Sequence, residues 1–134
     1  MIVQALEIGR QVDAPVKVFW TREEDIQHDM YRPYYYDRIS AGLDEQGRPV
    51  AWQHRIVGSS ILSRFAPGAV QNGVDDDAVE VAADLPYAIP NQLVDYVRQE
   101  PRTVPTAFWR GVGATRGTFV VESFIDDLAV QARN

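Results

Sequence analysis

The clearest hydrophobic pattern in the chain lies near its C-terminal end. Four apolar residues recur there at the spacing i, i+3, i+4 and i+7: Val121, Phe124, Ile125 and Leu128. This spacing places them on one face of an α-helix. The pattern therefore predicts an amphipathic helix that ends at about Ala129. An extended arm from Val104 leads into it, with Gly111, Gly113 and Gly117 just before or at the helix start.

Alternating apolar and polar residues predict two strands in the middle of the chain. They span Tyr34–Leu43 and Pro49–Gly58, and their connection, Asp44–Arg48, carries a glycine near its end, as hairpin loops often do. Each strand is expected to place one set of residues on a common face: Tyr35, Ile39, Ala41 and Leu43 on the first strand, and Val50, Trp52, His54 and Ile56 on the second. Because His54 lies between Gln53 and Arg55, we expect its ring to be half-exposed.

Shorter patterns predict the elements of the N-terminal quarter. A helix over Ile2–Val12 is followed by a short strand, Val16–Trp20. A second helix is expected from Thr21 to about Met30, since Thr21 and Glu24 have the spacing of a capping box.

Between the hairpin and the C-terminal helix, the chain predicts a surface segment, a short helix and a further strand. Residues 59–73 are expected at the surface. Asp75–Asp77 precede an apolar run, as acids at a helix N-cap and first turn do. Leu93–Val97 alternates as a strand after a turn held by two prolines.

Because helices and strands are interspersed and one strand pair is antiparallel, the predicted class is α+β. We expect two layers, with the helices on one face of a mixed sheet. The helical pattern begins abruptly at Ile2 without a cap, and the chain stops just after its last helix. Residues 1–134 are therefore predicted to be a single subdomain, truncated at both ends.

Composition excludes several classes of function. The net charge of −6 argues against nucleic acid or an anionic membrane surface as the main partner. The chain contains no cysteine, so it cannot supply a disulfide or an iron–sulfur ligand. No apolar run approaches the roughly 20 residues that span a membrane. A soluble protein of the cytoplasm or periplasm is expected.

The glycine-rich turn is the main candidate for chemistry. Glycine lets the backbone approach a ligand closely, and a helix N-terminus offers free N–H groups and a positive dipole to an anion. Arg110 adds a permanent cation beside the turn. A phosphate-bearing or other oxyanionic ligand is one interpretation of this stretch, and an ordinary glycine-rich connection into a core helix is the other.

Two further groups allow a functional and a structural interpretation. The tyrosines at positions 34–36 could form a stacking platform or a strand that contributes core and rim. The acidic group around His28 could bind a metal, but a helix dipole already accounts for acids in a first turn. Its members are Glu23, Glu24, Asp25, His28 and Asp29.

Three stretches resemble the molybdenum hydroxylases of the xanthine dehydrogenase and aldehyde oxidoreductase type. They are Tyr87–Asn91, Phe108–Gly113 and Val121–Ala129. The likeness is greatest to the large (beta) subunits of isoquinoline 1-oxidoreductases. Val16–Asp25 and the strand that ends in Asp44–Gly47 match the same subunits, so the resemblance covers nearly the whole chain.

The resemblance implies a large subunit that binds a molybdopterin cytosine dinucleotide. Such a subunit hydroxylates a carbon of an N-heterocycle or aldehyde with oxygen from water, and passes electrons to a separate iron–sulfur small subunit. By position, Arg110 matches the family arginine at the cofactor, and Gly111 and Gly113 match glycines that bring backbone close to it. Ala114 completes this predicted cofactor-binding set. Val112 falls where xanthine-type enzymes place a phenylalanine against the substrate, so Val112 and Trp109 are the predicted substrate-pocket residues.

The chain also departs from the family pattern. Ala78 takes the place of the xanthine-type substrate arginine, so a purine substrate is not expected. Arg116 replaces a glutamine, and Ala114 and Thr115 replace a glycine–proline pair. A cation at Arg116 could meet a phosphate or face solvent. The family's catalytic glutamate lies outside this sequence, so we expect no catalytic residue here and no activity from the chain alone.

Two other classes of function remain open from the sequence. One is a stand-alone phosphate- or nucleotide-binding module that uses the turn from Arg110 to Gly117. The other is a protein-interaction module that presents exposed aromatic side chains, which would be Tyr34, Tyr35, Tyr36, Phe65 and Trp109.

Overall fold

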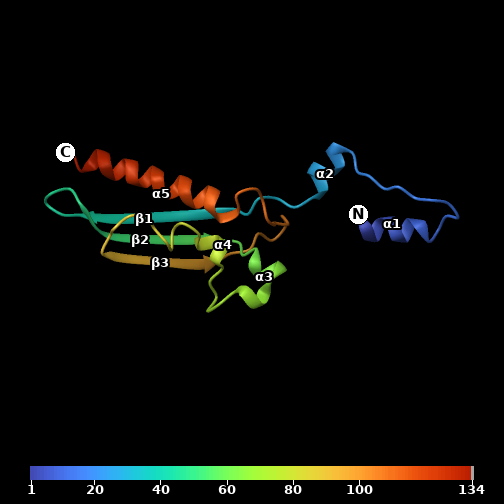
Figure 1. The fold of residues 1–134 in the computed structure, drawn as a ribbon, viewed down its shortest axis with the longest axis horizontal. Coiled ribbons are helices and arrows are strands. Elements are labelled where there is room, and N and C mark those ends of the chain that lie inside the picture. Colours follow the sequence, from blue (N-terminus) through green and yellow to red (C-terminus); the bar gives the residue numbers. More distant parts are fainter. Residues whose placement is uncertain (134) are drawn as a thin grey trace.

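A computed structural model of the chain describes residues 1–133. Its centre is a three-stranded sheet with the order β1-β2-β3, formed by β1 (Tyr35–Leu43), β2 (Pro49–Gly58) and β3 (Asn91–Arg98) (Figure 1). β1 runs antiparallel to β2, and β3 runs parallel to β2. The sheet is therefore mixed, and the α+β class predicted from the sequence is confirmed.

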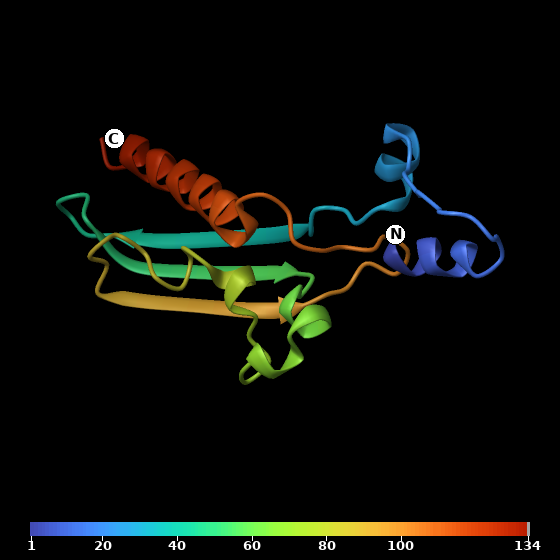
Figure 2. The same ribbon diagram turned by 45° about the vertical axis from the view of Figure 1, so that its right-hand side comes forward.

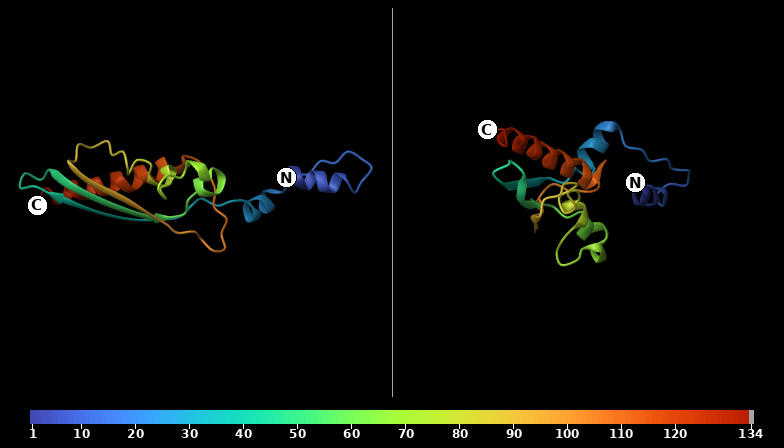
Figure 3. Two further views of the ribbon diagram at one scale, coloured as in Figure 1. Left: turned by 90° about the horizontal axis from the view of Figure 1, so that it is seen from below. Right: turned by 60° about the vertical axis from the view of Figure 1, so that its left-hand side comes forward.

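The helices fall into two groups by position. α4 (Asp76–Val79) and α5 (Val112–Gln131) pack on the sheet, and Figure 3 shows α5 along one face of the curved strands. Beyond the end of the sheet lie α1 (Ile2–Gly9) and α2 (Arg22–His28), as Figures 1 and 2 show. Two short turns, α3 (Leu62–Phe65) and η1 (Pro67–Ala69), follow β2. The expected layer of helices on one face is thus limited to α4 and α5.

The hairpin forms where the sequence predicts it. Asp44 Oδ1 accepts hydrogen bonds from the backbone N–H groups of Gln46 at 3.0 Å and Arg48 at 2.8 Å. Gly47 has a φ of +73°, which glycine adopts without a steric cost. Side chain and backbone of the loop therefore stabilise the turn. The strands pair from Tyr35 opposite Gly58 to Gly42 opposite Ala51, and the register shifts between Gly42 and Leu43.

The inner face of the sheet and one face of α5 build the core. Trp52 is buried in a cluster with Val121 and Leu128, and its ring meets Phe124 edge to face at a centroid distance of 5.3 Å. A second cluster joins Ile56 to α4. The predicted apolar faces of β2 and α5 are therefore confirmed. The outward-facing residues of β2, such as Gln53 and Arg55, are exposed.

Two expectations are wrong in detail. Val16–Trp20 is not a strand, and Phe19 is exposed. A strand needs a neighbour that accepts and donates backbone hydrogen bonds. These residues lie outside the three-stranded sheet. The segment 59–73 is at the surface only after its first three residues, because Ser59, Ser60 and Ile61 are buried.

The helix caps behave as predicted. Thr21 accepts from the Glu24 N–H, and Glu24 Oε2 accepts from the Thr21 N–H at 2.9 Å, which completes a capping box at the start of α2. Asp75 caps the single turn of α4 through the N–H groups of Asp77 and Ala78. By contrast, α1 buries none of its residues.

Candidate functional site

The turn before α5 has an unusual backbone. Gly111 is the N-cap with a φ of +73°, and a Cβ atom there would lie 1.7 Å from Thr115 Oγ1. The next residue, Val112, also has a positive φ, +39°. A β-branched residue in this region is strained, and such strain persists where the surroundings impose it. Here the N–H of Val112 donates to Trp109 O at 2.9 Å, and the N–H of Thr115 donates to Gly111 O at 3.0 Å.

Arg110 presents its side chain to solvent. Its guanidinium has no hydrogen bond or ion pair to any residue in the described range 1–133. Its carbonyl oxygen accepts from Arg32 Nη2 at 3.1 Å, and the Arg32 guanidinium lies 5.8 Å from the centroid of the Trp109 ring. The turn thus carries one cation that the fold does not use.

A cavity of about 220 Å³ opens beside this turn. Its walls include Trp109, Val112 and Gly113 from the turn and Tyr35 and Asp37 from β1. The two predicted substrate-pocket residues therefore meet in one cavity. The other three predicted site residues, Arg110, Gly111 and Ala114, do not line it.

Two of the glycines have a packing role that the sequence pattern did not reveal. Gly113 and Gly117 lie inside α5 rather than in the turn, and both are buried. A Cβ atom on Gly113 would lie 1.9 Å from Asp77 O, and one on Gly117 would lie 2.3 Å from Glu80 O. Only glycine fits at these two positions, because α5 passes too close to the backbone around α4 to leave room for a side chain.

The helix N-terminus is partly occupied by the protein itself. The N–H of Ala114 donates to Glu80 Oε2 at 2.8 Å. A carboxylate already satisfies this donor and brings a negative charge to the site where an anion was expected. Of the predicted cofactor-binding residues, Arg110 and Gly111 fit an anionic cofactor best, because one has a free cation and the other an exposed glycine backbone.

Arg116 faces inward and is not the solvent-facing cation that the sequence left as one alternative. Its guanidinium donates to Asp37 Oδ1 at 2.6 Å and to the carbonyl of Ala78, and lies 4.1 Å from the centroid of the Tyr35 ring. Its Nε atom is buried without a partner among the described residues. Arg116 therefore joins α5 to the sheet and to α4.

His54 is fully buried, so its predicted half-exposure is wrong. Its Nε2 atom lies 2.9 Å from Asp37 Oδ1, and because a carboxylate only accepts, the ring donates this hydrogen bond. Asp37 thus holds His54 and Arg116 together. The alternation of β1 places Asp37 on the inner face with Tyr35 and Ile39, and a carboxylate at that position was the signal for a buried polar cluster.

Two pKa values are shifted at and beside this cluster. Burial acts to raise the pKa of Asp37, but the hydrogen bond from His54 and the charge of Arg116 outweigh it and hold this pKa below its ordinary value of 3.8. Burial raises the pKa of Tyr35 to about 12. One wall of the cavity therefore carries an ionised carboxylate and a neutral phenol at pH 7.

The acidic group of α2 does not form a metal cage. Across residues 1–133, no three histidine or carboxylate side chains come close enough together to hold an ion. Glu24 is engaged in the capping box, and His28 Nδ1 lies 2.9 Å from Glu24 O. Among the neighbouring tyrosines, Tyr35 packs against the core while Tyr34 and Tyr36 are exposed.

Comparison with known proteins identifies the family. The model of the molybdopterin cofactor-binding domain matches residues 3–133, and the chain belongs to this family. The sequence is 30% identical over 132 residues to the beta subunit of isoquinoline 1-oxidoreductase from Brevundimonas diminuta, covering 96% of this chain and 16% of that protein. It is also 30% identical over 125 residues to a probable xanthine dehydrogenase subunit from Bacillus subtilis, covering 93% of this chain and 16% of that protein.

The chain therefore spans about one sixth of the length of these relatives. No solved structure matches it. None of the helices in the described part of the chain is both long and apolar enough to cross a membrane.

Proposed function

We propose that this chain is one segment of the molybdopterin-binding large subunit of an oxidoreductase that hydroxylates an N-heterocycle or an aldehyde with oxygen from water. The observation that carries the proposal is the Arg110 guanidinium, which is exposed and unpaired among residues 1–133, beside the glycine N-cap of α5. A cation in this position suits the negative charges of a dinucleotide cofactor.

In this proposal Arg110 and Gly111 contact the cofactor, with Gly113 and Ala114 behind them as support for the turn. The cofactor is a molybdopterin cytosine dinucleotide and supplies the metal centre for oxygen transfer. Trp109 and Val112 form an apolar wall for the substrate. Valine is smaller than the phenylalanine of xanthine-type enzymes, so this wall suits a bulkier ring.

The partners in this proposal are the remaining segments of the large subunit and an iron–sulfur small subunit. The N-terminal arm exposes large apolar side chains, among them Ile2, Leu6 and Phe19. Exposed apolar groups of this kind mark contact surfaces. We expect the remaining large-subunit segments to cover them.

Cofactor retention tests the role of Arg110. In an assembly of this segment with the remaining large-subunit sequence and the small subunit, Arg110→Gln should lower the pterin content per subunit about tenfold, since a lost charged contact is worth roughly 1.5 to 3 kcal/mol. Arg48→Gln, at an exposed arginine of the hairpin loop, is the matched control and should retain the wild-type pterin content. Equal retention in both variants would contradict the assignment.

Turnover tests the rest of the proposal. The complete assembly should oxidise isoquinoline or benzaldehyde with an artificial electron acceptor, and the 134-residue chain alone should show no turnover. Hydroxylation by the isolated chain would overturn the expectation that the catalytic base lies elsewhere. Nucleotide binding by the isolated chain that disappears in Arg110→Ala would favour a stand-alone binding module instead.

A further inference from the structure

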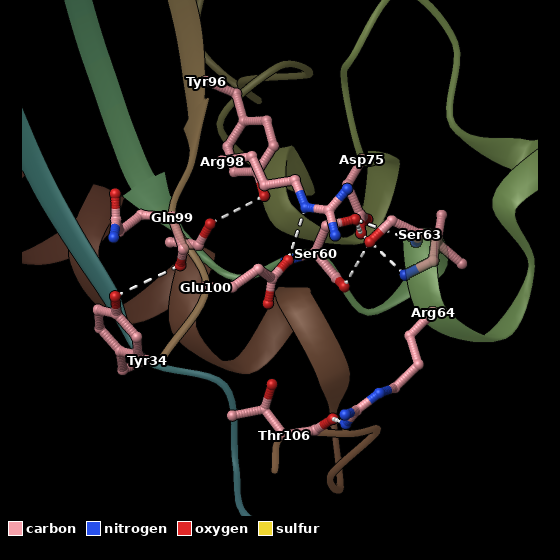
Figure 4. Close-up of polar contacts among 12 residues, drawn as sticks. Tyr34, Ser60, Ser63, Arg64, Asp75, Tyr96, Arg98, Gln99, Glu100 and Thr106 are labelled. Atoms are coloured by element: carbon pink, nitrogen blue, oxygen red, sulfur yellow. Dashed lines mark hydrogen bonds and ion pairs between the residues drawn. The ribbon is translucent and has the colours of Figure 1, made fainter. Parts of the chain in front are cut away.

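A second cavity, of about 180 Å³, lies where β3 ends and the arm toward α5 begins. It shares none of the lining residues of the cavity beside Trp109. Its lining is mostly polar and includes Ser60, Arg64, Arg98, Glu100 and Thr106. Figure 4 shows Arg98, Glu100 and Ser60 on one side of this space, with Arg64 and Thr106 on the other.

Two arginines supply unused donors to this cavity. Arg98 donates through Nε to Glu100 Oε1 at 2.6 Å, and Arg64 Nη1 donates to the carbonyl oxygen of Thr106 at 3.0 Å and lies 3.8 Å from Met30 Sδ. Their remaining guanidinium N–H groups have no hydrogen-bond partner in the described chain. Glu100 balances one of the two charges, so the cavity keeps a net charge of +1.

The polar groups around these arginines are held in place. The N–H of Ser60 donates to Glu100 Oε1 at 3.1 Å, and the Ser60 hydroxyl donates to Asp75 Oδ2 at 2.6 Å. Asp75 is fully buried and also accepts from the N–H of Leu62 at 2.9 Å. The wall that carries Arg64 is therefore tied to the N-cap of α4, which keeps the site preorganised.

Thr106 adds a third donor to this cavity. The residue lines the cavity and is 8% exposed, and its hydroxyl makes no hydrogen bond within residues 1–133. This hydroxyl is not one of the fully buried polar atoms that lack a partner in the described chain, so it is open and free to donate. A ligand in the cavity can therefore accept hydrogen bonds from Thr106 and from both arginines.

We propose that this cavity binds a small oxyanion, either a phosphate or a carboxylate group. The oxyanion accepts from the free N–H groups of Arg64 and Arg98 and from the Thr106 hydroxyl, and neutralises the remaining positive charge. Charge-assisted hydrogen bonds of this kind are the strong ones, and arginine forks match both anions. This site is separate from the turn at Arg110 and does not depend on the function proposed above.

Titration of the isotopically labelled chain with inorganic phosphate or with acetate, at constant ionic strength, tests the site. We expect saturable amide shift changes at Ser60, Glu100 and Thr106 in nuclear magnetic resonance spectra, with Gly47 in the distant hairpin loop unaffected. Saturation by phosphate alone, or by acetate alone, assigns the oxyanion class. The absence of saturable changes with both anions overturns the proposal.

Variants separate specific binding from general charge effects. Arg98→Gln and Arg64→Gln should each weaken binding about tenfold, whereas Arg48→Gln, which removes the same charge from the hairpin loop, should leave it unchanged. Thr106→Val keeps the shape and removes only the hydroxyl, so it should leave stability near that of wild type while weakening binding. If the arginine variants misfold, the Thr106→Val variant alone tests the site. Oxyanion binding by that variant at the wild-type affinity would contradict the proposal.

Discussion

At the scale of single residues, Asp37 links two side chains that lie out of solvent. Its carboxylate is 9% exposed and pairs with the buried ring of His54 and with Arg116, which is 16% exposed. Removing one partner of a buried pair leaves the other charge without compensation, which costs more than an exposed pair contributes. The chain offers a matched comparison, because Arg55 and Asp95 form an ion pair on the outer face of the same sheet.

We predict that Asp37→Asn lowers the free energy of unfolding by about 3 kcal/mol. The physical reason is that Arg116 keeps its charge in a partly buried position while losing the one carboxylate that pairs with it among residues 1–133. Urea denaturation at pH 7 measures the difference. The control, Asp95→Asn, should cost less than about 1 kcal/mol, and equal losses in the two variants would show that burial does not matter here.

The pH dependence of the free energy of unfolding tests the same interaction, because its direction follows from the lowered pKa of Asp37. Because the pKa of Asp37 in the folded state lies below its ordinary value, ionised Asp37 stabilises the fold above the unfolded-state pKa. That contribution is lost as the pH falls through the folded-state pKa. The gap between wild type and Asp37→Asn due to this group should therefore persist down to about pH 4 and shrink below it.

At the scale of elements, the contact of α5 with α4 explains the glycines better than ligand binding alone does. Gly113 lies against the carbonyl of Asp77, and Gly117 lies against that of Glu80. The neighbouring N–H of Ala114 is bonded to Glu80. Contacts with α4 and Glu80 thus hold the start of α5 in place, while the Arg110 guanidinium before it faces solvent.

We predict that Gly113→Ala destabilises the fold by about 2 kcal/mol, because the new methyl group would overlap the Asp77 carbonyl. Helix propensity alone predicts a gain of about 1 kcal/mol from the same change, so the two explanations differ in sign. Thermal or urea unfolding measures the effect. Thr118→Ala, at an exposed position of α5, should stay within about 0.5 kcal/mol of wild type.

At the scale of the whole molecule, the stable part is the sheet with α4 and α5. The N-terminal arm lies beyond the end of the sheet, and its first helix buries no residue (Figure 2). Segments with few buried apolar contacts contribute little to global stability. The exposed apolar groups of the arm are consistent with its proposed role as a contact for further large-subunit segments.

We predict that removing residues 1–20 changes the free energy of unfolding by less than about 0.5 kcal/mol. The reason is that the deleted residues add little to the two buried clusters. Urea midpoints of the full and shortened chains test this. A loss above about 1 kcal/mol would mean that the arm packs on the core in solution.

Local sequence patterns determined the hairpin, the capping box of α2, the N-cap at Asp75 and the apolar face of α5, and each of these is confirmed. These features depend on spacing within a few residues, where side-chain direction follows directly from helix or strand geometry. The tertiary structure alone decided that Val16–Trp20 has no strand partner, that His54 is buried against Asp37, and that Arg116 faces inward. It also brought together the two arginines of the second cavity, Arg64 and Arg98, which are 34 residues apart in the sequence. Such contacts depend on which elements pack against one another, and a local pattern carries no information about a neighbour distant in the chain.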